Sequence, residues 1–565
     1  MSLADDLFAR HHSLLDEAVA AAASRAYYSA FPESPSPRVY GDSAAAEGSA
    51  AFEALLGHDF PVATPGAEGV VATEKSPFGL PLDVRYPRVA PSGVPALLEA
   101  ARAGLVDWRD AGVEARVGVG LEVLKRLHAR VFELAHAVMH TSGQAFVMAF
   151  QAGGANALDR ALEAIAYAYT EMTRIPRSVV WEKPGRKAPT RMEKTFTVVP
   201  RGVALVVGCN TFPTWNSWPG LFASLVTGNP VVVKPHPGAC LPSAIAVQVC
   251  REVLAEAGFD PNLVTLAAED PADGLAAVLA VRPEVRLVDF TGSSAFGTWL
   301  EDNARQAIVF TEKAGVNTIV VDSTDSFAAM CSNLAFSLSL YTGQMCTAPQ
   351  NIYLPANGID TDEGHKSVDD VVAGLDQALT GMVGDDARAV ELLGGVVNAG
   401  VLERLSHVGE GGGTVAIASR EVTHPSYADA VVRTPTVVTL DVADSATYEH
   451  ECFGPVAYLI RTGSTDESIE VFRRTVTEHG AMTAAVYSTS EAVVEAMRSA
   501  ALDAGVALSE NLTGQVFVNQ SAAFSDFHGT GANPAANSTF TDGAFVASRF
   551  RFVQSRRHAD LSDST

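Results

Sequence analysis

The residue with the clearest chemical potential is Cys346, which lies in the stretch 341–349. A helix is expected just before it, over 326–340, because apolar residues recur there with the spacing of one buried helical face. These residues are Phe327, Met330, Cys331, Leu334 and Leu338. Gly343 interrupts the pattern, so we expect Cys346 where the helix end meets a turn. A thiol in such a place is accessible to a substrate and can have a lowered pKa, although a single cysteine is more often a small buried hydrophobic residue.

The elements expected to position this thiol include a parallel sheet. Residues 202–311 alternate between strand-like and helix-like segments. Strands are predicted at 203–207, 231–234, 264–266, 287–290 and 307–311, and one of the helices between them at 243–257, ending before Gly258. Strands separated by helices of this length form crossovers in a parallel sheet. Ligands of such sheets bind beyond the carboxyl ends of the strands.

Polar groups follow four of these strands. In chain order they are Asn210, Lys234, the turn containing Gly292 and Ser293 with Gly297 behind it, and Glu312. A Gly-Ser turn that opens a helix offers free N–H groups to an anion, and a lysine beside it can hold a ribose or a phosphate. The set predicts a nucleotide site, although the G-x-G-x-x-G fingerprint is absent. Two alternatives stay open: Asn210 is also a good turn residue, and Glu312 can be a surface carboxylate paired with Lys313.

The rest of the chain predicts secondary structure and domain organisation but suggests no catalytic residues. Residues 1–90 are expected to form short helices and loops, followed by one long helix with Leu121 and Val138 on its apolar face and another over 158–169. A second α/β region is expected over 322–520, with a strand at 516–519, and an edge strand or arm over 543–557. The basic segment 174–200 can pair with another subunit or form a solvated surface hairpin.

Composition excludes several classes of protein. The chain has 565 residues, 47% of them hydrophobic, and a net charge of −25. This charge argues against binding to nucleic acid or to an anionic membrane. Six cysteines without paired spacing favour a reducing compartment, the acidic N-terminus does not resemble a signal peptide, and no apolar run has the length of a membrane span. We therefore expect a cytoplasmic enzyme.

Taken together, these motifs resemble the aldehyde dehydrogenase superfamily over about residues 100–550. The matching residues are Asn210 near Phe212-Pro213, Gly228-Asn229 before Lys234-Pro235, Thr291-Gly292-Ser293 with Gly297, Glu312 with Gly315 and Asn317, Gly343-Gln344-Met345-Cys346, and Glu451 with Phe453-Gly454-Pro455. The resemblance implies an α/β fold with a Rossmann-type cofactor domain, an α/β catalytic domain and a small β oligomerisation arm. The domains would be 1–95 as an extension, 96–173 with 203–312 for the cofactor, 174–202 with 540–565 as the arm, and 313–520 for catalysis.

The same resemblance implies roles for single residues. Cys346 would be the nucleophile, Glu312 the base that activates water, and Asn210 the donor to the oxyanion, with Thr211 as the alternative occupant of that position. Lys234, Gly292, Ser293, Gly297, Glu451 and Phe453 would bind the cofactor. The loop 527–531 departs from the family pattern, so we expect an unusual substrate entrance. His236, His450 and His528 have no metal-ligand spacing, so no metal is expected.

The resemblance also implies a cofactor, a substrate class and an oligomeric state. Family members that choose NAD commonly carry a Glu three residues after the lysine, where this chain has Pro237, so NADP is expected to be accepted and even preferred over NAD. The chain length, the long N-terminal extension and residues 209–216 resemble superfamily members that act in phenylacetate degradation, which implies a small-molecule aldehyde substrate, in particular a CoA-linked semialdehyde. Alternatives are a CoA-acylating enzyme and an inactive binding subunit. A homodimer or homotetramer is expected.

Overall fold

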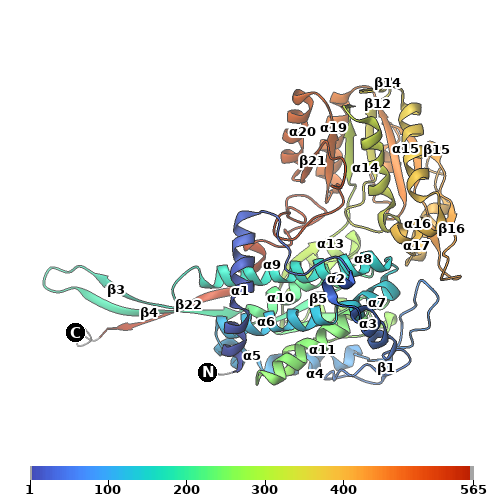
Figure 1. Cartoon of the computed structure of the whole chain (residues 1–565). Coiled ribbons are helices and arrows are strands. Elements are labelled where there is room, and N and C mark those ends of the chain that lie inside the picture. The colour runs from blue at the N-terminus through green and yellow to red at the C-terminus, as the bar shows by residue number, and fades with distance from the viewer. Residues whose placement is uncertain (1–2, 560–565) are drawn as a thin grey trace.

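A parallel five-stranded sheet forms the centre of the larger lobe in the computed structural model, which describes residues 3–559 (Figure 1). Its strand order is β7-β6-β5-β8-β9, and nearly all of its side chains are buried or half-buried, as is usual in parallel sheets. The strands are β5 (Val203–Val207), β6 (Val231–Lys234), β7 (Val264–Leu266), β8 (Val285–Thr291) and β9 (Ile308–Glu312). All five predicted strands are therefore confirmed to within two residues at either end.

Helices cover both faces of this sheet, and they differ from the predictions in two places. The predicted helix at 243–257 is α11 (Leu241–Glu256), followed by Gly258 at φ +85°. The predicted long helix is two helices, α6 (Val113–Ala129) and α7 (Val131–Ser142), which meet at Arg130. The N-terminus holds one 22-residue helix, α1 (Leu3–Ser24), where only short helices were expected. Among the described residues, no helix combines the length and the apolar composition needed to cross a membrane.

The other helices of this lobe are α2 (Pro37–Tyr40), α3 (Ala44–Glu53), α4 (Val94–Ala103), α5 (Leu105–Asp110), α8 (Phe146–Phe150), α9 (Asn156–Thr173), α10 (Trp218–Val226), α12 (Leu275–Ala280) and α13 (Ser294–Asn303). Helix α9 confirms the helix predicted over 158–169. Helices α1, α6, α9 and α10 pack together beside the sheet, and their apolar residues belong to one continuous core with strands β5 and β6.

A seven-stranded sheet forms the second lobe, with the order β15-β18-β19-β12-β10-β20-β21. Its strands are β10 (Thr318–Val321), β12 (Asn351–Pro355), β15 (Thr414–Ile417), β18 (Thr436–Asp441), β19 (Val456–Thr462), β20 (Ala484–Tyr487) and β21 (Leu508–Glu510). Only the edge strand β15 is antiparallel to its neighbour. The helices around it are α14 (Phe327–Ser339), α15 (Val368–Val383), α16 (Asp386–Leu393), α17 (Ala399–Ser406), α18 (Ser445–Tyr448), α19 (Thr465–His479) and α20 (Glu491–Ala504).

Two predictions within this lobe have opposite outcomes. Helix α14 is the predicted helix, and its five patterned apolar residues are all buried. The predicted strand at 516–519 is wrong, because this stretch has no strand partner. Side chains hold its backbone instead: Asn333 donates to the carbonyl of Val516 at 2.7 Å, and Thr347 donates to the carbonyl of Asn519 at 2.8 Å.

A three-stranded antiparallel sheet projects away from both lobes as an arm (Figure 1). It consists of β3 (Ser178–Lys183), β4 (Thr190–Pro200) and β22 (Phe550–His558), with β4 in the centre. The basic hairpin and the C-terminal edge strand predicted from the sequence thus share one sheet. The first residues of the predicted 543–557 strand form a short helix instead, α21 (Gly543–Ala547).

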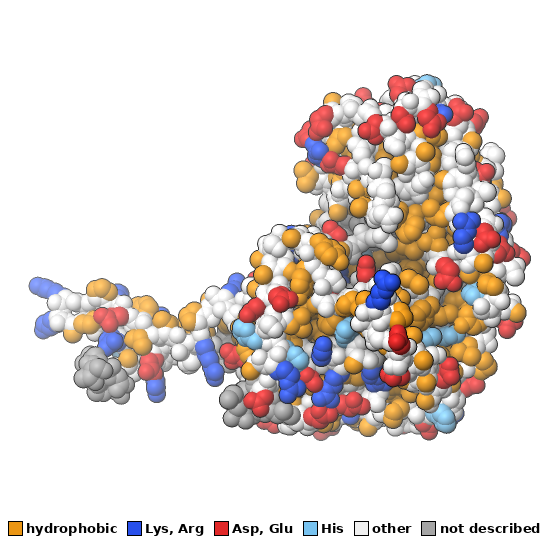
Figure 2. Space-filling model, viewed as in Figure 1, with side chains coloured by type: hydrophobic (Ala, Val, Ile, Leu, Met, Phe, Trp, Pro, Cys, Tyr) orange, Lys and Arg blue, Asp and Glu red, His pale blue; other side chains and the backbone are white. Residues whose placement is uncertain are grey.

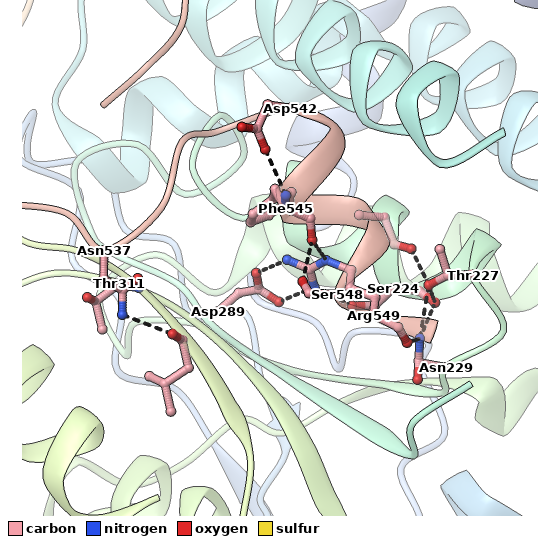
Figure 3. A network of polar contacts seen from close by, with 12 residues as sticks. Ser224, Thr227, Asn229, Asp289, Thr311, Asn537, Asp542, Phe545, Ser548 and Arg549 are labelled. Atoms are coloured by element: carbon pink, nitrogen blue, oxygen red, sulfur yellow. Dashed lines mark hydrogen bonds and ion pairs between the residues drawn. The ribbon is translucent and has the colours of Figure 1, made fainter. Parts of the chain in front are cut away.

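The arm is fixed to the larger lobe by a buried network around Arg549 (Figure 3). The guanidinium of Arg549 donates to both carboxylate oxygens of Asp289, at 2.5 and 2.8 Å, and to Ser224 at 2.7 Å. The side chain of Asn229 donates to the carbonyl of Arg549 at 3.0 Å and accepts from the backbone N–H of Arg201 at 2.8 Å. The Gly228-Asn229 motif is therefore structural here, and it joins the start of β5 to the C-terminal segment.

Candidate active site

Cys346 follows a sharp turn at the end of α14, as expected. Tyr341, Thr342 and Gly343 have φ of +53°, +55° and +63°, a left-handed conformation that is rare for residues other than glycine. A Cβ at position 343 would lie 2.4 Å from the carbonyl oxygen of Gly454, so only glycine fits there. The turn redirects the chain from the helix to β12 and exposes Cys346 between the two lobes.

The Cys346 thiol touches a histidine and a carboxylate from distant parts of the chain. Its sulfur lies 3.8 Å from Nε2 of His528, and this nitrogen lies 3.0 Å from Oε1 of Glu312. The other oxygen of Glu312 accepts a hydrogen bond of 2.8 Å from the side chain of Asn216. Trp215 packs edge-on against the His528 ring, with 4.5 Å between ring centroids. The side chain of Glu312 is 1% exposed, so it is not the surface carboxylate of the alternative interpretation.

The pKa of the Cys346 thiol is shifted in the opposite direction from the one expected from the sequence. Burial, followed by the charge of Glu312, raises the pKa of Cys346 well above its ordinary value, whereas a lowered pKa was expected from the turn. Burial also acts to raise the pKa of Glu312, but the charge and hydrogen bond of His528, with hydrogen bonds from Cys346 and Asn216, bring it below its ordinary value. The resting site therefore holds a protonated thiol beside an ionised carboxylate.

A cavity of about 1030 Å³ opens at Cys346. Asn216, Trp215, Met345 and His528 line it close to the thiol. Neither Asn210 nor Thr211 is among the lining residues. The side chain of Asn210 donates to the carbonyl of Thr141 at 3.1 Å, and the carbonyl of Thr211 accepts from Gln144 at 2.7 Å. The structure thus brings a different amide, Asn216, to Glu312 and the cavity, whereas both residues named from the sequence lie outside the lining.

Replacement of Asn216 with alanine is expected to lower kcat by about 10²–10³-fold, the usual loss when one oxyanion donor is removed. Asn210→Ala serves as the matched control, because its amide only bridges to Thr141, and we expect it to keep kcat within about threefold of the parent, a change below 1 kcal/mol. Steady-state kinetics of both variants decide between the two amides. A larger loss in Asn210→Ala than in Asn216→Ala would restore the original assignment.

Four predicted cofactor residues lie at the carboxyl edge of the five-stranded sheet. Lys234 ends β6, and the turn with Gly292 and Ser293 follows β8; the two strands flank β5, where the strand order reverses. Ser293 caps α13 by accepting from the N–H of Phe296, and Gly297 lies in the first turn of that helix. The turn is half-buried to exposed and leads into a ten-residue helix. The N–H of Gly292 already donates to the carbonyl of Glu312 at 3.1 Å, so the N–H groups at 293–295 are those placed to meet a phosphate. This donor set fits a dinucleotide.

The two remaining predicted cofactor residues lie on the other side of the thiol. Glu451 and Phe453 line a narrow cavity of about 20 Å³ that Cys346 also borders, together with Gly343 and Asn317. Desolvation raises the pKa of Glu451 to about 7, against the opposing charge of Arg404. Cys346 therefore stands between a large cavity and a narrow one, as a nucleophile between a substrate and a cofactor would.

Cys346, Glu312 and His528 also form the one cluster among the described residues whose donor atoms could hold a metal ion, since these atoms lie within 4.8 Å of one another. Spacing along the sequence gave no sign of it, because the three residues are 34 and 182 positions apart. The signal that was present is the departure of the loop 527–531 from the family pattern, and His528 lies in this loop.

Comparisons with known proteins agree with this geometry. The model of the aldehyde dehydrogenase family matches residues 82–531, so the chain belongs to that family of oxidoreductases, which uses NAD(P). The chain is 55% identical to the crystal structure of an NAD-dependent aldehyde dehydrogenase from Burkholderia multivorans, with a TM-score of 0.96 over 98% of this chain and 99% of that one. These findings confirm the fold class and the family predicted from the motifs.

More distant relatives are dehydrogenases of semialdehydes and of a cyclic imine. The chain is 24% identical to 1-pyrroline-5-carboxylate dehydrogenase 1 of Halalkalibacterium halodurans, over 74% of this chain and 78% of that protein. It is 27% identical to N-succinylglutamate 5-semialdehyde dehydrogenase of Paraburkholderia xenovorans, over 66% of this chain and 72% of that protein.

Proposed function

We propose that the chain oxidises an aldehyde to a carboxylic acid with Cys346 as the nucleophile. The observation that carries this proposal is the contact of Cys346 with His528 and, through it, Glu312, at the end of a large cavity. A thiol adds to an aldehyde carbon to give a thiohemiacetal, and loss of hydride then leaves a thioester. The nicotinamide of the cofactor, when bound, accepts the hydride.

The residues around Cys346 supply the proton transfers that this reaction needs. Because the thiol is protonated at rest, a base must take its proton as the sulfur attacks, and the ionised Glu312, which accepts a hydrogen bond from Cys346, is placed to take it. The amide of Asn216 and the backbone N–H of Cys346 stabilise the oxygen that gains negative charge. Glu312 then activates the water that hydrolyses the thioester.

A screen of aldehydes with NAD and NADP tests this function, with reduced cofactor followed by absorbance and Cys346→Ala as the blank. Oxidation of at least one aldehyde by the parent and not by the variant is the expected result. Absence of any oxidation across aliphatic, aromatic and semialdehyde substrates would favour the inactive binding subunit.

Transfer of the acyl group to CoA is the second candidate. In that case free CoA, and not water, resolves the thioester, and an acyl-CoA is formed. The ionised, hydrogen-bonded Glu312 favours water, because it is placed to take a proton from it. Detection of an acyl-CoA product in the presence of free CoA would reverse this preference.

A narrower proposal, a CoA-linked semialdehyde from phenylacetate degradation, rests on the resemblance of the chain length, the N-terminal extension and residues 209–216. The charges of the substrate cavity favour another class of aldehyde.

The surroundings of Lys234 bear on the choice between NAD and NADP. Lys234 and Glu269 form an ion pair, and each side chain is 6% exposed. A carboxylate paired with this lysine offsets its charge and disfavours a 2′-phosphate, and a carboxylate is a good acceptor for a ribose hydroxyl. We therefore propose NAD as the preferred cofactor, against the preference for NADP that was predicted from Pro237.

Glu269→Gln is expected to lower the ratio of the NADPH dissociation constant to the NADH dissociation constant by at least about tenfold. The reason is that removal of one repulsive charge is worth at least about 1.4 kcal/mol in a buried site. Fluorescence titration of both reduced cofactors gives the two dissociation constants without turnover. The exposed Glu99→Gln is the control and should leave their ratio unchanged. Tighter binding of NADPH than NADH by the parent chain would contradict the proposal.

The arm is proposed to pair with another subunit. It carries exposed apolar side chains at Val179, Val180 and Val553, which are 42%, 52% and 53% exposed. Such residues on a projecting sheet favour a covered face. A dimer or tetramer in light scattering, converted to monomer by deletion of residues 553–565, which leaves Arg549 and its network in place, would support this assembly, and a monomeric parent chain would contradict it.

A further inference from the structure

The segment that follows α1 forms one side of the cavity that opens at Cys346. Tyr27, Tyr28, Ser29 and Glu33 all line it. The segment is fixed in place by Asp159 of α9. The carboxylate of Asp159 accepts a hydrogen bond of 2.7 Å from the hydroxyl of Ser29 and one of 2.9 Å from the N–H of Ala30. The N-terminal extension, for which the sequence suggested no chemistry, is therefore part of the substrate cavity.

Apolar side chains dominate the interior of this cavity. Phe212 and Trp215 lie on one side, and Phe336 and Phe517 stack on another with 3.7 Å between ring centroids. The hollow between the two lobes shows mostly hydrophobic atoms in the space-filling view (Figure 2). A volume of about 1030 Å³ is at the upper end of the usual range for small-molecule sites, so an aromatic ring with substituents fits.

Apart from His528 beside the thiol, the ionisable groups that line the cavity are acidic. Glu33, Glu391 and Asp526 are exposed to it, and Asp159 is buried in its wall. Among the residues 3–559, no lysine or arginine lines it. Arg160 lies behind Trp215, 5.2 Å from the ring centroid, and is already paired with Glu163 at 2.8 Å. A carboxylate or phosphate on the substrate would find no counter-charge here and would be repelled.

We propose that this cavity selects an uncharged, largely apolar aldehyde, and that the segment 27–33 is the wall that excludes anionic aldehydes. The inference rests on the proposed function and names the substrate class for the same site. CoA thioesters fall into the excluded class, because their phosphates would approach Glu33 and Asp526 at the entrance.

A pair of nearly isosteric substrates tests the proposal. Methyl 4-formylbenzoate and 4-formylbenzoate differ by one charge and one methyl group. We expect kcat/KM at low salt to be at least about tenfold higher for the ester, since like charges placed together cost at least 1.4 kcal/mol, and the ratio to shrink at high salt. Equal or higher efficiency with the acid would overturn the proposal.

Two triple variants test whether the acidic side chains cause this preference. The triple variant Glu33→Gln, Glu391→Gln, Asp526→Asn should lower the ester-to-acid ratio at least about threefold, as expected when surface repulsion is removed. The control variant Glu47→Gln, Glu410→Gln, Asp466→Asn removes three exposed charges elsewhere and should leave the ratio unchanged. An unchanged ratio in the first variant would overturn the role of the wall.

Calorimetric binding of methyl benzoate and benzoate separates this inference from the proposed reaction, because neither compound is oxidised. Tighter binding of the ester supports the inference, and equal or tighter binding of benzoate overturns it. If neither formylbenzoate is oxidised, the proposed reaction fails, while this binding result still decides the charge selectivity.

Discussion

Cys346→Ala is expected to lose at least about four orders of magnitude in aldehyde oxidation, since removal of a covalent nucleophile typically has an effect of this size or more. The site offers no substitute of equal reach. Cys209 lies next to Asn216, with 3.9 Å from its sulfur to the amide oxygen, but it is not among the residues that line the cavity. Steady-state rates with saturating aldehyde and cofactor measure the loss.

Cys250→Ala is the matched control, because it removes a thiol that is buried in α11 away from the cavity. It should keep nearly full activity and lose some stability, about 1 kcal/mol or more, through the small space it leaves. Comparable losses of activity in the two variants would show that Cys346 acts through packing and not as a nucleophile.

The pH dependence of alkylation gives a second readout of the same thiol. Because burial and Glu312 raise the pKa of Cys346, the free enzyme should react slowly with iodoacetamide at pH 7 and faster as pH rises toward and beyond 9. Mass spectrometry of the modified peptide identifies the residue. Fast, pH-independent alkylation at pH 7 would indicate a lowered pKa, as the sequence first suggested.

The sequence was sufficient where local pattern decides structure. Helix α14 coincides with its prediction because one of its faces is buried, which requires apolar residues at helical spacing. Strands β5, β6 and β7 coincide with theirs because they are buried throughout, which requires a short continuous run of apolar residues. The break at Arg130 between α6 and α7 was missed, because the apolar pattern continues through it. The predicted strand at 516–519 failed for the complementary reason: its composition suits a strand, but the fold offers it no neighbour.

The site itself was only partly predictable. Cys346 and Glu312 were found because their motifs are distinctive and each follows a predicted element. Asn216 was missed because the choice among neighbouring amides depends on how the 208–218 loop turns, and only tertiary contacts with Thr141 and Glu312 settle that. His528 and the segment 27–33 reach the cavity from the two ends of the chain. No spacing rule connects them to residue 346, so their positions depend on the packing of the two lobes.

Glu312→Gln is the second large effect that the site predicts. Glutamine keeps the size and the hydrogen-bonding reach of the side chain but cannot take a proton from water, so turnover should fall by about 10²–10⁴-fold. The substitution also removes the charge of Glu312, which helps to raise the pKa of Cys346, so the thiol ionises more readily and needs no carboxylate to attack. Acylation should therefore continue while hydrolysis stops, and the thioester should accumulate on Cys346.

Intact-protein mass spectrometry after mixing with aldehyde and NAD tests this separation. The expected adduct equals the mass of the aldehyde less two hydrogens, and hydroxylamine should remove it. Glu256→Gln, which removes a carboxylate paired with Arg126 at 2.6 Å and outside the lining of both cavities, should turn over normally and show no adduct. Normal turnover of Glu312→Gln, or a loss of turnover without an adduct, would exclude Glu312 as the base for hydrolysis.

The pH profile then separates His528 from Glu312. The charge of His528 helps to hold the pKa of Glu312 below its ordinary value, so Glu312 is ionised over the whole neutral range and hydrolysis should decline only in acid. In His528→Gln, whose amide nitrogen can lie close to the position of Nε2, that charge is gone while a hydrogen-bond donor to Glu312 is retained. Burial then dominates, the pKa of Glu312 rises, and the acidic limb of kcat should move to higher pH. An acidic limb that stays in place, with kcat lowered equally at every pH, would mean that His528 supports the site only through packing.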